Sequence, residues 1–182
     1  MTAAPGQLIA LVGPSGSGKD TLLTGLVRLC PSIHRARRTI SRPQAAGEDF
    51  ESVSAEAFRR LRDAGVFAFH WQAHGLHYGI RAAELAPCAS GRTVIFNGSR
   101  GALRDLAARF PGLRIIVVSV APERLAARLA ARGREPAEEI SRRLGRAAFA
   151  LPAGVAIRVI SNDSTPEAGV AALLAAVQEA RG

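Results

Sequence analysis

The chain has 182 residues, 48% of them hydrophobic, and a formal net charge of +9, from 24 lysines and arginines against 15 acidic residues. This is enough apolar surface for one core, and no apolar run approaches the roughly 18 residues of a membrane span, which excludes a disordered chain and an integral membrane protein. Two cysteines, Cys30 and Cys88, are too few for a disulfide scaffold, so a reducing cytoplasm is the expected location.

The basic residues are arginines, with the single exception of Lys19. They indicate either a surface that attracts phosphates or a bias of residue usage in a chain that avoids lysine. The sequence has neither the spacing of a zinc finger nor the aromatic–glycine motif of an RNA-binding strand, so no nucleic-acid partner is expected.

The first elements have the order of a nucleotide-binding unit. The apolar run Leu8–Val12, ended by Gly13-Pro14, predicts a buried strand. Leucines at helical spacing predict a helix over Thr21–Leu29, which Pro31 ends. Strand, glycine loop and helix in this order predict the start of an α/β fold.

The next stretch differs in pattern and predicts a small insert, at about 33–89, lying over the strand ends. Short mixed segments and a turn at Ala46-Gly47 precede a helix over Ala55–Ala64, which Ser54 can cap. Two strands, Phe67–Trp71 and His77–Ile80, are expected around a turn at His74-Gly75.

Strand and helix alternate again to the end of the chain, which predicts a parallel sheet with right-handed crossovers. The expected strands are Thr93–Asn97, Leu113–Val120 and Val155–Ser161, and the expected helices are Leu103–Phe110, Pro122–Arg132, Pro136–Ala150 and Pro166–Ala180. We therefore expect one α/β domain over 1–182, with its core formed by 1–32 and 90–182.

A glycine-rich turn lies between the first strand and the first helix. It fits the pattern G-x-x-x-x-G-K with the residues Gly13, Pro14, Ser15, Gly16, Ser17, Gly18 and Lys19. The glycines let successive N–H groups point at phosphate oxygens, the helix adds its positive end, and the lysine reaches the β- and γ-phosphates. The motif in this context predicts binding of a nucleoside triphosphate.

One position departs from that pattern. The residue after the lysine, normally a Ser or Thr whose hydroxyl binds Mg²⁺, is Asp20, and Thr21 follows it. A carboxylate is a good ligand for Mg²⁺, so Asp20 binds the metal directly or through water, or shares the role with Thr21. The alternative is that Asp20 only caps the helix.

Three motifs in order resemble the guanylate kinase branch of nucleoside monophosphate kinases over nearly the whole chain. They are the glycine loop, the stretch from Ser41-Arg42-Pro43 through Gly47-Glu48-Asp49-Phe50 to Val53-Ser54, and Arg132-Gly133-Arg134 followed by Ile140 and Arg142-Arg143-Leu144. The resemblance implies a P-loop fold whose parallel sheet is flanked by helices, an acceptor-binding insert and an arginine-bearing lid at about 132–150.

The guanine pocket of that branch does not match. An acidic residue and an aspartate recognise guanine there, and this chain has Gln72 and Asn97 at the matching places. The N1–H and N2–H₂ groups of guanine need acceptors, of which a carboxylate is the best, so a GMP acceptor is disfavoured. In the phosphate cluster Arg42 and Tyr78 are kept, and Arg38 is an added cation.

With these departures the chain resembles the ribose 1,5-bisphosphate phosphokinases, relatives of guanylate kinases in phosphonate breakdown. The matching motifs are Gly18-Lys19-Asp20, Gly75-Leu76-His77-Tyr78-Gly79, Asn97-Gly98-Ser99-Arg100, Arg132-Gly133-Arg134-Glu135 and Asn162-Asp163. The resemblance implies transfer of the γ-phosphate of ATP to the 1-phosphate of ribose 1,5-bisphosphate, giving 5-phospho-α-D-ribose 1-diphosphate.

The resemblance also implies residue roles, each weighed against a structural one. Lys19, Arg132, Arg134 and Arg143 would act on the transferred phosphate, although the three arginines could also form a solvated helix face. The acceptor would be bound through its phosphates by Arg38, Arg42 and Tyr78, unless these form a strand edge with exposed cations. Its ribose or second phosphate would be bound by Asn97, Ser99 and Arg100, unless these only cap a helix. Asn162 and Asp163 would contact adenine, or form a turn into the last helix.

Two other functions stay open. One is a guanylate or other nucleoside monophosphate kinase, and the other is a guanylate-kinase-like binding module without catalysis. The expected partners are ATP and a sugar phosphate, with no nucleic acid and no membrane, for a monomer or homodimer.

Overall fold

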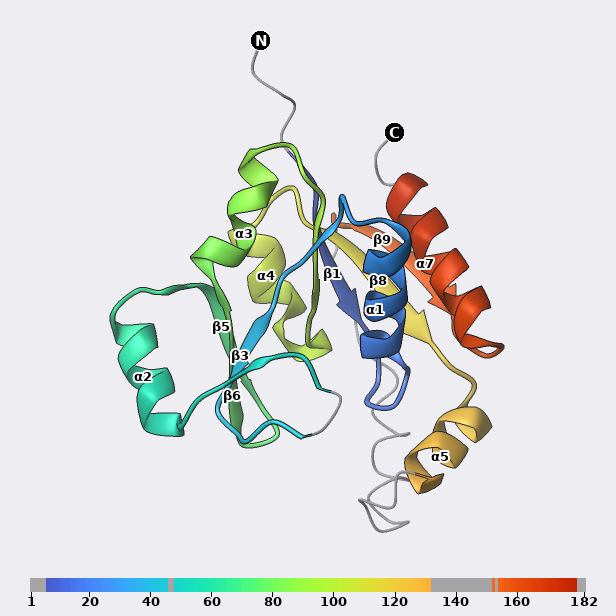
Figure 1. Ribbon diagram of the computed structural model, residues 1–182, viewed down its shortest axis with the longest axis horizontal. Coiled ribbons are helices and arrows are strands. Elements are labelled where there is room, and N and C mark those ends of the chain that lie inside the picture. Colours follow the sequence, from blue (N-terminus) through green and yellow to red (C-terminus); the bar gives the residue numbers. More distant parts are fainter. Residues whose placement is uncertain (1–5, 46–47, 132–151, 153, 180–182) are drawn as a thin grey trace.

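A five-stranded parallel sheet forms the core of the computed structural model, which describes residues 6–45, 48–131, 152 and 154–179 (Figure 1). Its strand order is β2-β7-β1-β8-β9, and every pair is parallel. The strands are β1 (Leu8–Val12), β2 (His34–Arg35), β7 (Val94–Asn97), β8 (Arg114–Ser119) and β9 (Ala156–Ser161). The predicted parallel sheet is thus confirmed, and β1 at its centre is buried along its whole length.

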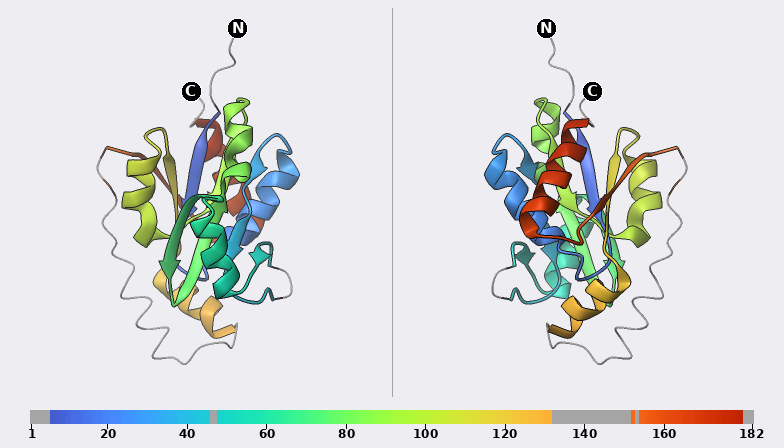
Figure 2. Two further views of the ribbon diagram at one scale, coloured as in Figure 1. Left: turned by 90° about the vertical axis from the view of Figure 1, so that its left-hand side faces the viewer. Right: turned by 90° about the vertical axis from the view of Figure 1, so that its right-hand side faces the viewer.

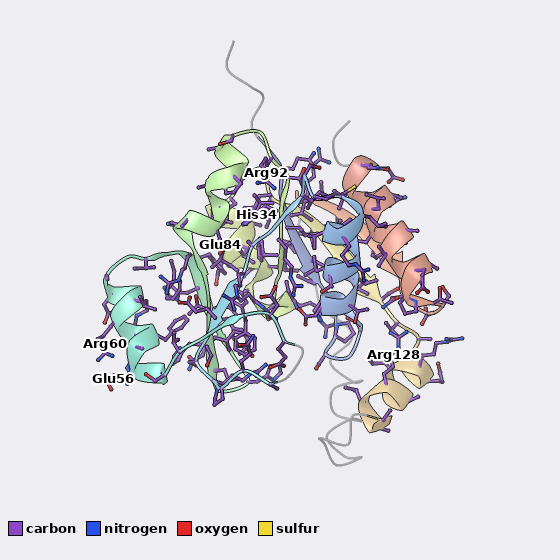
Figure 3. All side chains as sticks on the ribbon, in the orientation of Figure 1. His34, Glu56, Arg60, Glu84, Arg92 and Arg128 are labelled. Atoms are coloured by element: carbon purple, nitrogen blue, oxygen red, sulfur yellow. The ribbon has the colours of Figure 1, made fainter. Side chains whose placement is uncertain are left out.

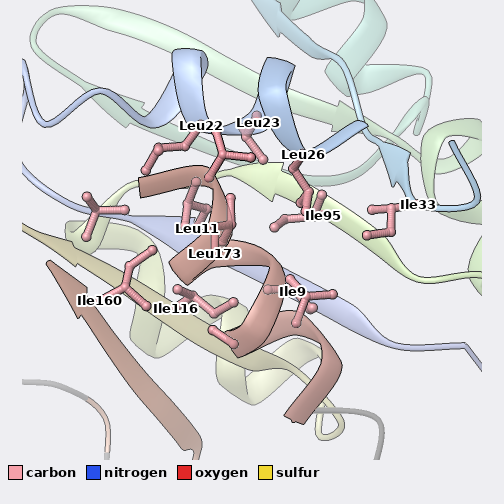
Figure 4. Close-up of a cluster of buried hydrophobic side chains, with 14 residues drawn as sticks. Ile9, Leu11, Leu22, Leu23, Leu26, Ile33, Ile95, Ile116, Ile160 and Leu173 are labelled. Carbon is pink, nitrogen blue, oxygen red and sulfur yellow. The ribbon is translucent and has the colours of Figure 1, made fainter. Parts of the chain in front are cut away.

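Helices cover both faces of this sheet. Side chains alternate along β1, so Ile9 and Leu11 face one side and Leu8 and Ala10 the other. On the first side they pack against α1 (Lys19–Leu29) and α7 (Pro166–Glu179), in the cluster that Figure 4 shows. On the second side lies α4 (Leu103–Arg109), as Figure 2 shows, after a 3-10 turn at Arg100–Ala102.

A second sheet lies beside the carboxyl ends of the core strands. Its order is β4-β3-β6-β5, with β3 (Arg38–Ile40), β4 (Glu51–Ser52), β5 (Phe67–Ala73) and β6 (Leu76–Arg81). The predicted turn between β5 and β6 is confirmed: His74 and Gly75 have φ values of 52° and 73°, as in the tight turns that match strand twist. The predicted helix in the insert is α2 (Ala55–Asp63), and the Ser54 side chain accepts from the Ala57 N–H at 3.0 Å.

Two features of the middle segment differ from the sequence-based expectation. A helix not predicted, α3 (Ala82–Ala89), follows β6 and contains Pro87. The strand β2, which falls within residues 33–89, pairs with β7 in the core sheet, whereas β3 begins the four-stranded sheet. The chain between Arg35 and Arg38 therefore passes from one sheet to the other.

The remaining predicted elements agree with the structure to within two residues, and they include α5 (Pro122–Ala131). The predicted helix Pro136–Ala150, the lid at about 132–150 and the turn at Ala46-Gly47 lie outside the described residues. In the part of the chain that is described, no helix is long and apolar enough to cross a bilayer.

Candidate active site

The glycine loop connects β1 to α1, and Lys19 is the first residue of that helix. Its ammonium group donates to the carbonyl oxygens of Gly13 at 3.0 Å and Pro14 at 2.9 Å, and lies 3.5 Å from the hydroxyl of Ser17. The lysine side chain thus reaches back over the loop from the N-terminal end of α1. This is the arrangement that binds a polyphosphate.

Asn162, which directly follows β9, holds this loop in place. The residue is only 6% exposed, and its Nδ2 donates to the Ser17 carbonyl at 2.7 Å. Gly18 has a φ of +88°, and a Cβ there would lie 2.6 Å from the same Nδ2, so both the backbone conformation and the contact require glycine. On the other side, Arg128 of α5 (Figure 3) donates to the Asn162 carbonyl at 2.8 Å.

A cleft of about 800 Å³ extends from the loop to the four-stranded sheet. Most of the predicted site residues line this cleft: Gly13, Ser15, Gly16, Gly18, Lys19, Asp20, Thr21, Arg38, Arg42, Tyr78, Asn97, Ser99 and Arg100. Pro14, Ser17, Asn162 and Asp163 do not line it. The predicted catalytic arginines Arg132, Arg134 and Arg143 lie outside the described residues.

Asp20 lines the cleft, and polar side chains of three strands, β2, β7 and β3, approach its carboxylate. Its Oδ1 accepts from Arg35 at 3.1 Å and from the Asn97 amide at 3.1 Å, and lies 3.7 Å from the Arg38 guanidinium. The N-cap of α1 is Gly18, and no side chain caps it. The structure therefore gives Asp20 contacts across the cleft in place of the capping contact considered as an alternative.

Three of the arginines predicted to bind the acceptor line the cleft: Arg38, Arg42 and Arg100. Arg42 makes a bidentate ion pair with Glu48, at 2.7 and 2.8 Å, and its guanidinium lies 4.5 Å from the centre of the Phe50 ring. The hydrogen bond with Glu48 raises the pKa of Arg42. Burial lowers the pKa of Arg38 and of Arg100. An arginine still stays charged at neutral pH, so both side chains are suited to an anionic ligand.

Tyr78 forms part of the same wall and stacks on Trp71, with ring centres 5.4 Å apart and planes 8° from parallel. Trp71, expected as the last residue of a strand in the insert, packs against the core cluster and also lines the cleft. Glu48 was not predicted to be a site residue, although it belongs to the Gly47-Glu48-Asp49-Phe50 stretch on which the family resemblance rests. Arg35 was not selected either, because nothing in an arginine-rich stretch distinguishes it.

Asp163 lies apart from the cleft. It accepts from the Ser161 hydroxyl at 2.6 Å and from the backbone N–H of Ala121, ahead of α5, at 2.7 Å, and these two bonds lower its pKa. The role of Asn162 and Asp163 at adenine stays a prediction, and the contacts present connect the loop, β9 and α5.

The donor set at the loop fits Mg²⁺. Among the described residues no three His, Cys, Asp or Glu side chains gather to hold a metal by themselves. Mg²⁺ commonly takes one or two protein oxygens and completes its shell with phosphate and water. The half-exposed carboxylate of Asp20, beside Thr21 and the loop, can supply such an oxygen.

A family model described as an AAA domain matches residues 8–152. A protein of Ruegeria sp. (strain TM1040), named ribose 1,5-bisphosphate phosphokinase, is 45% identical over 98% of this chain and 95% of its own length. A protein of the same name from Acidiphilium cryptum is 45% identical over 93% of this chain and 91% of its own. The solved structure of guanylate kinase from Anaplasma phagocytophilum superposes with a TM-score of 0.72 at 18% identity, over 98% of this chain and 88% of that one. This likeness confirms the predicted guanylate-kinase-like fold.

Proposed function

The chain belongs to the family of ribose 1,5-bisphosphate phosphokinases, and we infer that it transfers the γ-phosphoryl group of ATP to the 1-phosphate of ribose 1,5-bisphosphate. The products are ADP and 5-phospho-α-D-ribose 1-diphosphate. The sequence-based prediction of a kinase of this family is confirmed.

The main observation that supports ribose 1,5-bisphosphate as the acceptor is the distribution of charged side chains along the cleft. One end is the phosphate loop, and the other contains Arg38, Arg42 and Arg100. Two carboxylates, Asp20 and Glu48, line the described part of the cleft, and arginines bind both of them. Guanine would need a carboxylate available to its N1–H and N2–H₂ groups, so the cleft favours a ligand with two phosphates over GMP.

For this reaction the protein has to position the two substrates and neutralise the charge of their phosphates. An oxygen of the acceptor's 1-phosphate, already ionised at neutral pH, attacks the γ-phosphorus of ATP, and the bond from that phosphorus to the β–γ bridging oxygen breaks. No proton is removed from the nucleophile, so no general base is required. Lys19 and the loop N–H groups would hold the ATP phosphates, and Arg38 and Arg42 the acceptor, which cancels the repulsion between two anions.

Mg²⁺, when bound through Asp20 or Thr21, would neutralise charge between the β- and γ-phosphates. Arg132, Arg134 and Arg143 stay our candidates for the groups that close on the transferred phosphate, and Asn97 and Ser99 for contacts with the ribose. A cytoplasmic monomer or homodimer is the form in which we expect the enzyme to act.

The test is turnover of Mg-ATP with ribose 1,5-bisphosphate and, separately, with GMP, followed by ADP release. We expect turnover with the sugar bisphosphate and a kcat/KM for GMP lower by at least about a hundredfold. Comparable or better turnover with GMP would refute the acceptor, and tight ATP binding with turnover of neither would favour a non-catalytic module. Lys19→Met serves as the inactive control.

A further inference from the structure

Arg35 contacts Asp20 but does not line the cleft. Its guanidinium donates to the Thr24 hydroxyl at 3.0 Å and to Asp20 at 3.1 Å, and lies 3.7 Å from Asp49. The side chain is 13% exposed, so these contacts fix it against α1. Arg35 is thus an oriented cation that an acceptor in the cleft would not touch directly.

Asp20 needs a positively charged partner because its carboxylate lies in the cleft that has to bind anions. Its carboxylate is 59% exposed, in a cleft that has to bind two polyanions, and an uncompensated negative charge there would repel them. Two arginines pair with it, Arg35 at 3.1 Å and Arg38 at 3.7 Å. Arg38 lines the cleft, and binding an acceptor phosphate would draw it away from Asp20.

The two sheets separate the roles of these arginines. Arg35 is the last residue of β2 in the core sheet, next to α1, and Arg38 is the first residue of β3 in the four-stranded sheet. Arg35 can therefore stay on Asp20 while Arg38 turns to the ligand.

We propose that Arg35 is a positioning residue for acceptor binding: it neutralises Asp20 and so releases Arg38 to bind the phosphate of the sugar. This inference rests on the proposed function, since it concerns the same cleft. Besides its predicted contact with the metal, Asp20 would then be the partner that holds Arg35 in place, and this pairing does not depend on a metal.

The test is calorimetric titration of ribose 1,5-bisphosphate into the full chain in buffer with EDTA and without nucleotide, which removes any effect of the metal. Arg35→Met should raise the Kd about tenfold, the size expected of one partly screened charge. Arg37→Met is the matched control, because Arg37 also pairs with Asp49, at 3.1 Å, without contacting Asp20, and its Kd should stay within about twofold of the wild type.

The second variant separates charge from structure. In the double variant Arg35→Met/Asp20→Asn the acceptor should bind within about twofold of Asp20→Asn alone, because no carboxylate is left to neutralise. An unchanged Kd in Arg35→Met overturns the proposal, and so does an equal loss with and without the Asp20 carboxylate. If Arg35→Met fails to fold, Arg35→Gln, which is also neutral but can still hydrogen-bond Thr24, is titrated instead: a loss of affinity that Asp20→Asn suppresses supports the proposal, and no loss overturns it. Failure of the wild type to bind the sugar bisphosphate, with GMP bound, would instead refute the proposed function.

Discussion

The contact between Asn162 and the phosphate loop yields the sharpest prediction. Asn162→Ala removes the donor to the Ser17 carbonyl, a buried hydrogen bond at 2.7 Å that joins residues far apart in the sequence. Leaving a buried carbonyl without its partner costs about 1–3 kcal/mol. Taking about 2 kcal/mol, the melting temperature should fall by about 4–8 °C. If the same contact sets the loop conformation that binds phosphate, ATP affinity should fall by about 10- to 30-fold.

The assay measures the melting temperature, the Kd for ATP and the KM for the acceptor on the same preparations. The KM for the acceptor should change by less than about twofold, because Asn162 does not line the cleft. Ser119→Ala is the control, since it removes another hydrogen bond to a backbone carbonyl, that of Ile160, without touching the loop. A lower melting temperature with unchanged ATP affinity would refute the reasoning, because Asn162 would then stabilise the fold without shaping the loop.

Three further outcomes are expected. Asp20→Ala should lower kcat, with partial recovery at high Mg²⁺; a rate equal to the wild type at all Mg²⁺ concentrations would remove Asp20 from the metal site. The hydrogen bond from Arg81 lowers the pKa of Glu51, so the folded state binds fewer protons than the unfolded one, and this stabilisation is present above the unfolded pKa and is lost as the pH falls through the folded one. Melting curves between about pH 3 and 6 should then show wild type and Glu51→Gln converging toward the acid end, and a constant difference between them would contradict the linkage. Gly79→Ala would place a Cβ 2.6 Å from the Phe67 ring and should destabilise the chain by about 1–3 kcal/mol, whereas an unchanged denaturant midpoint would show that the ring can move aside.

Local patterns in the sequence were sufficient to predict four of the five strands of the core sheet and the helices that pack on it. The leucines of α1 and the apolar run of β1 predicted their elements because periodicity and burial agree there. The helix α3 was missed because Pro87 is normally a helix breaker, and β2 because two residues carry no periodic pattern.

The site was predictable to the extent that it is local in sequence. The glycine loop is one continuous motif, so its conformation and its lysine followed from it directly. The pairing of Asp20 with Arg35, and of Ser17 with Asn162, depends on which strands lie side by side, and no spacing in the chain reports that. The place of Trp71 depended on the same information, because its side chain packs against the core cluster and also lines the cleft.

The stacked pair in that wall has a practical consequence. Trp71 and Tyr78 are the single tryptophan and the single tyrosine of the chain, and they lie parallel 5.4 Å apart beside the acceptor arginines. Indole emission on excitation in the near ultraviolet therefore comes from this wall of the cleft, where we propose that the acceptor binds, and from no other tryptophan of the chain. The intrinsic tryptophan fluorescence of the unlabelled protein should therefore report acceptor binding in a stopped-flow experiment, separately from the chemical step.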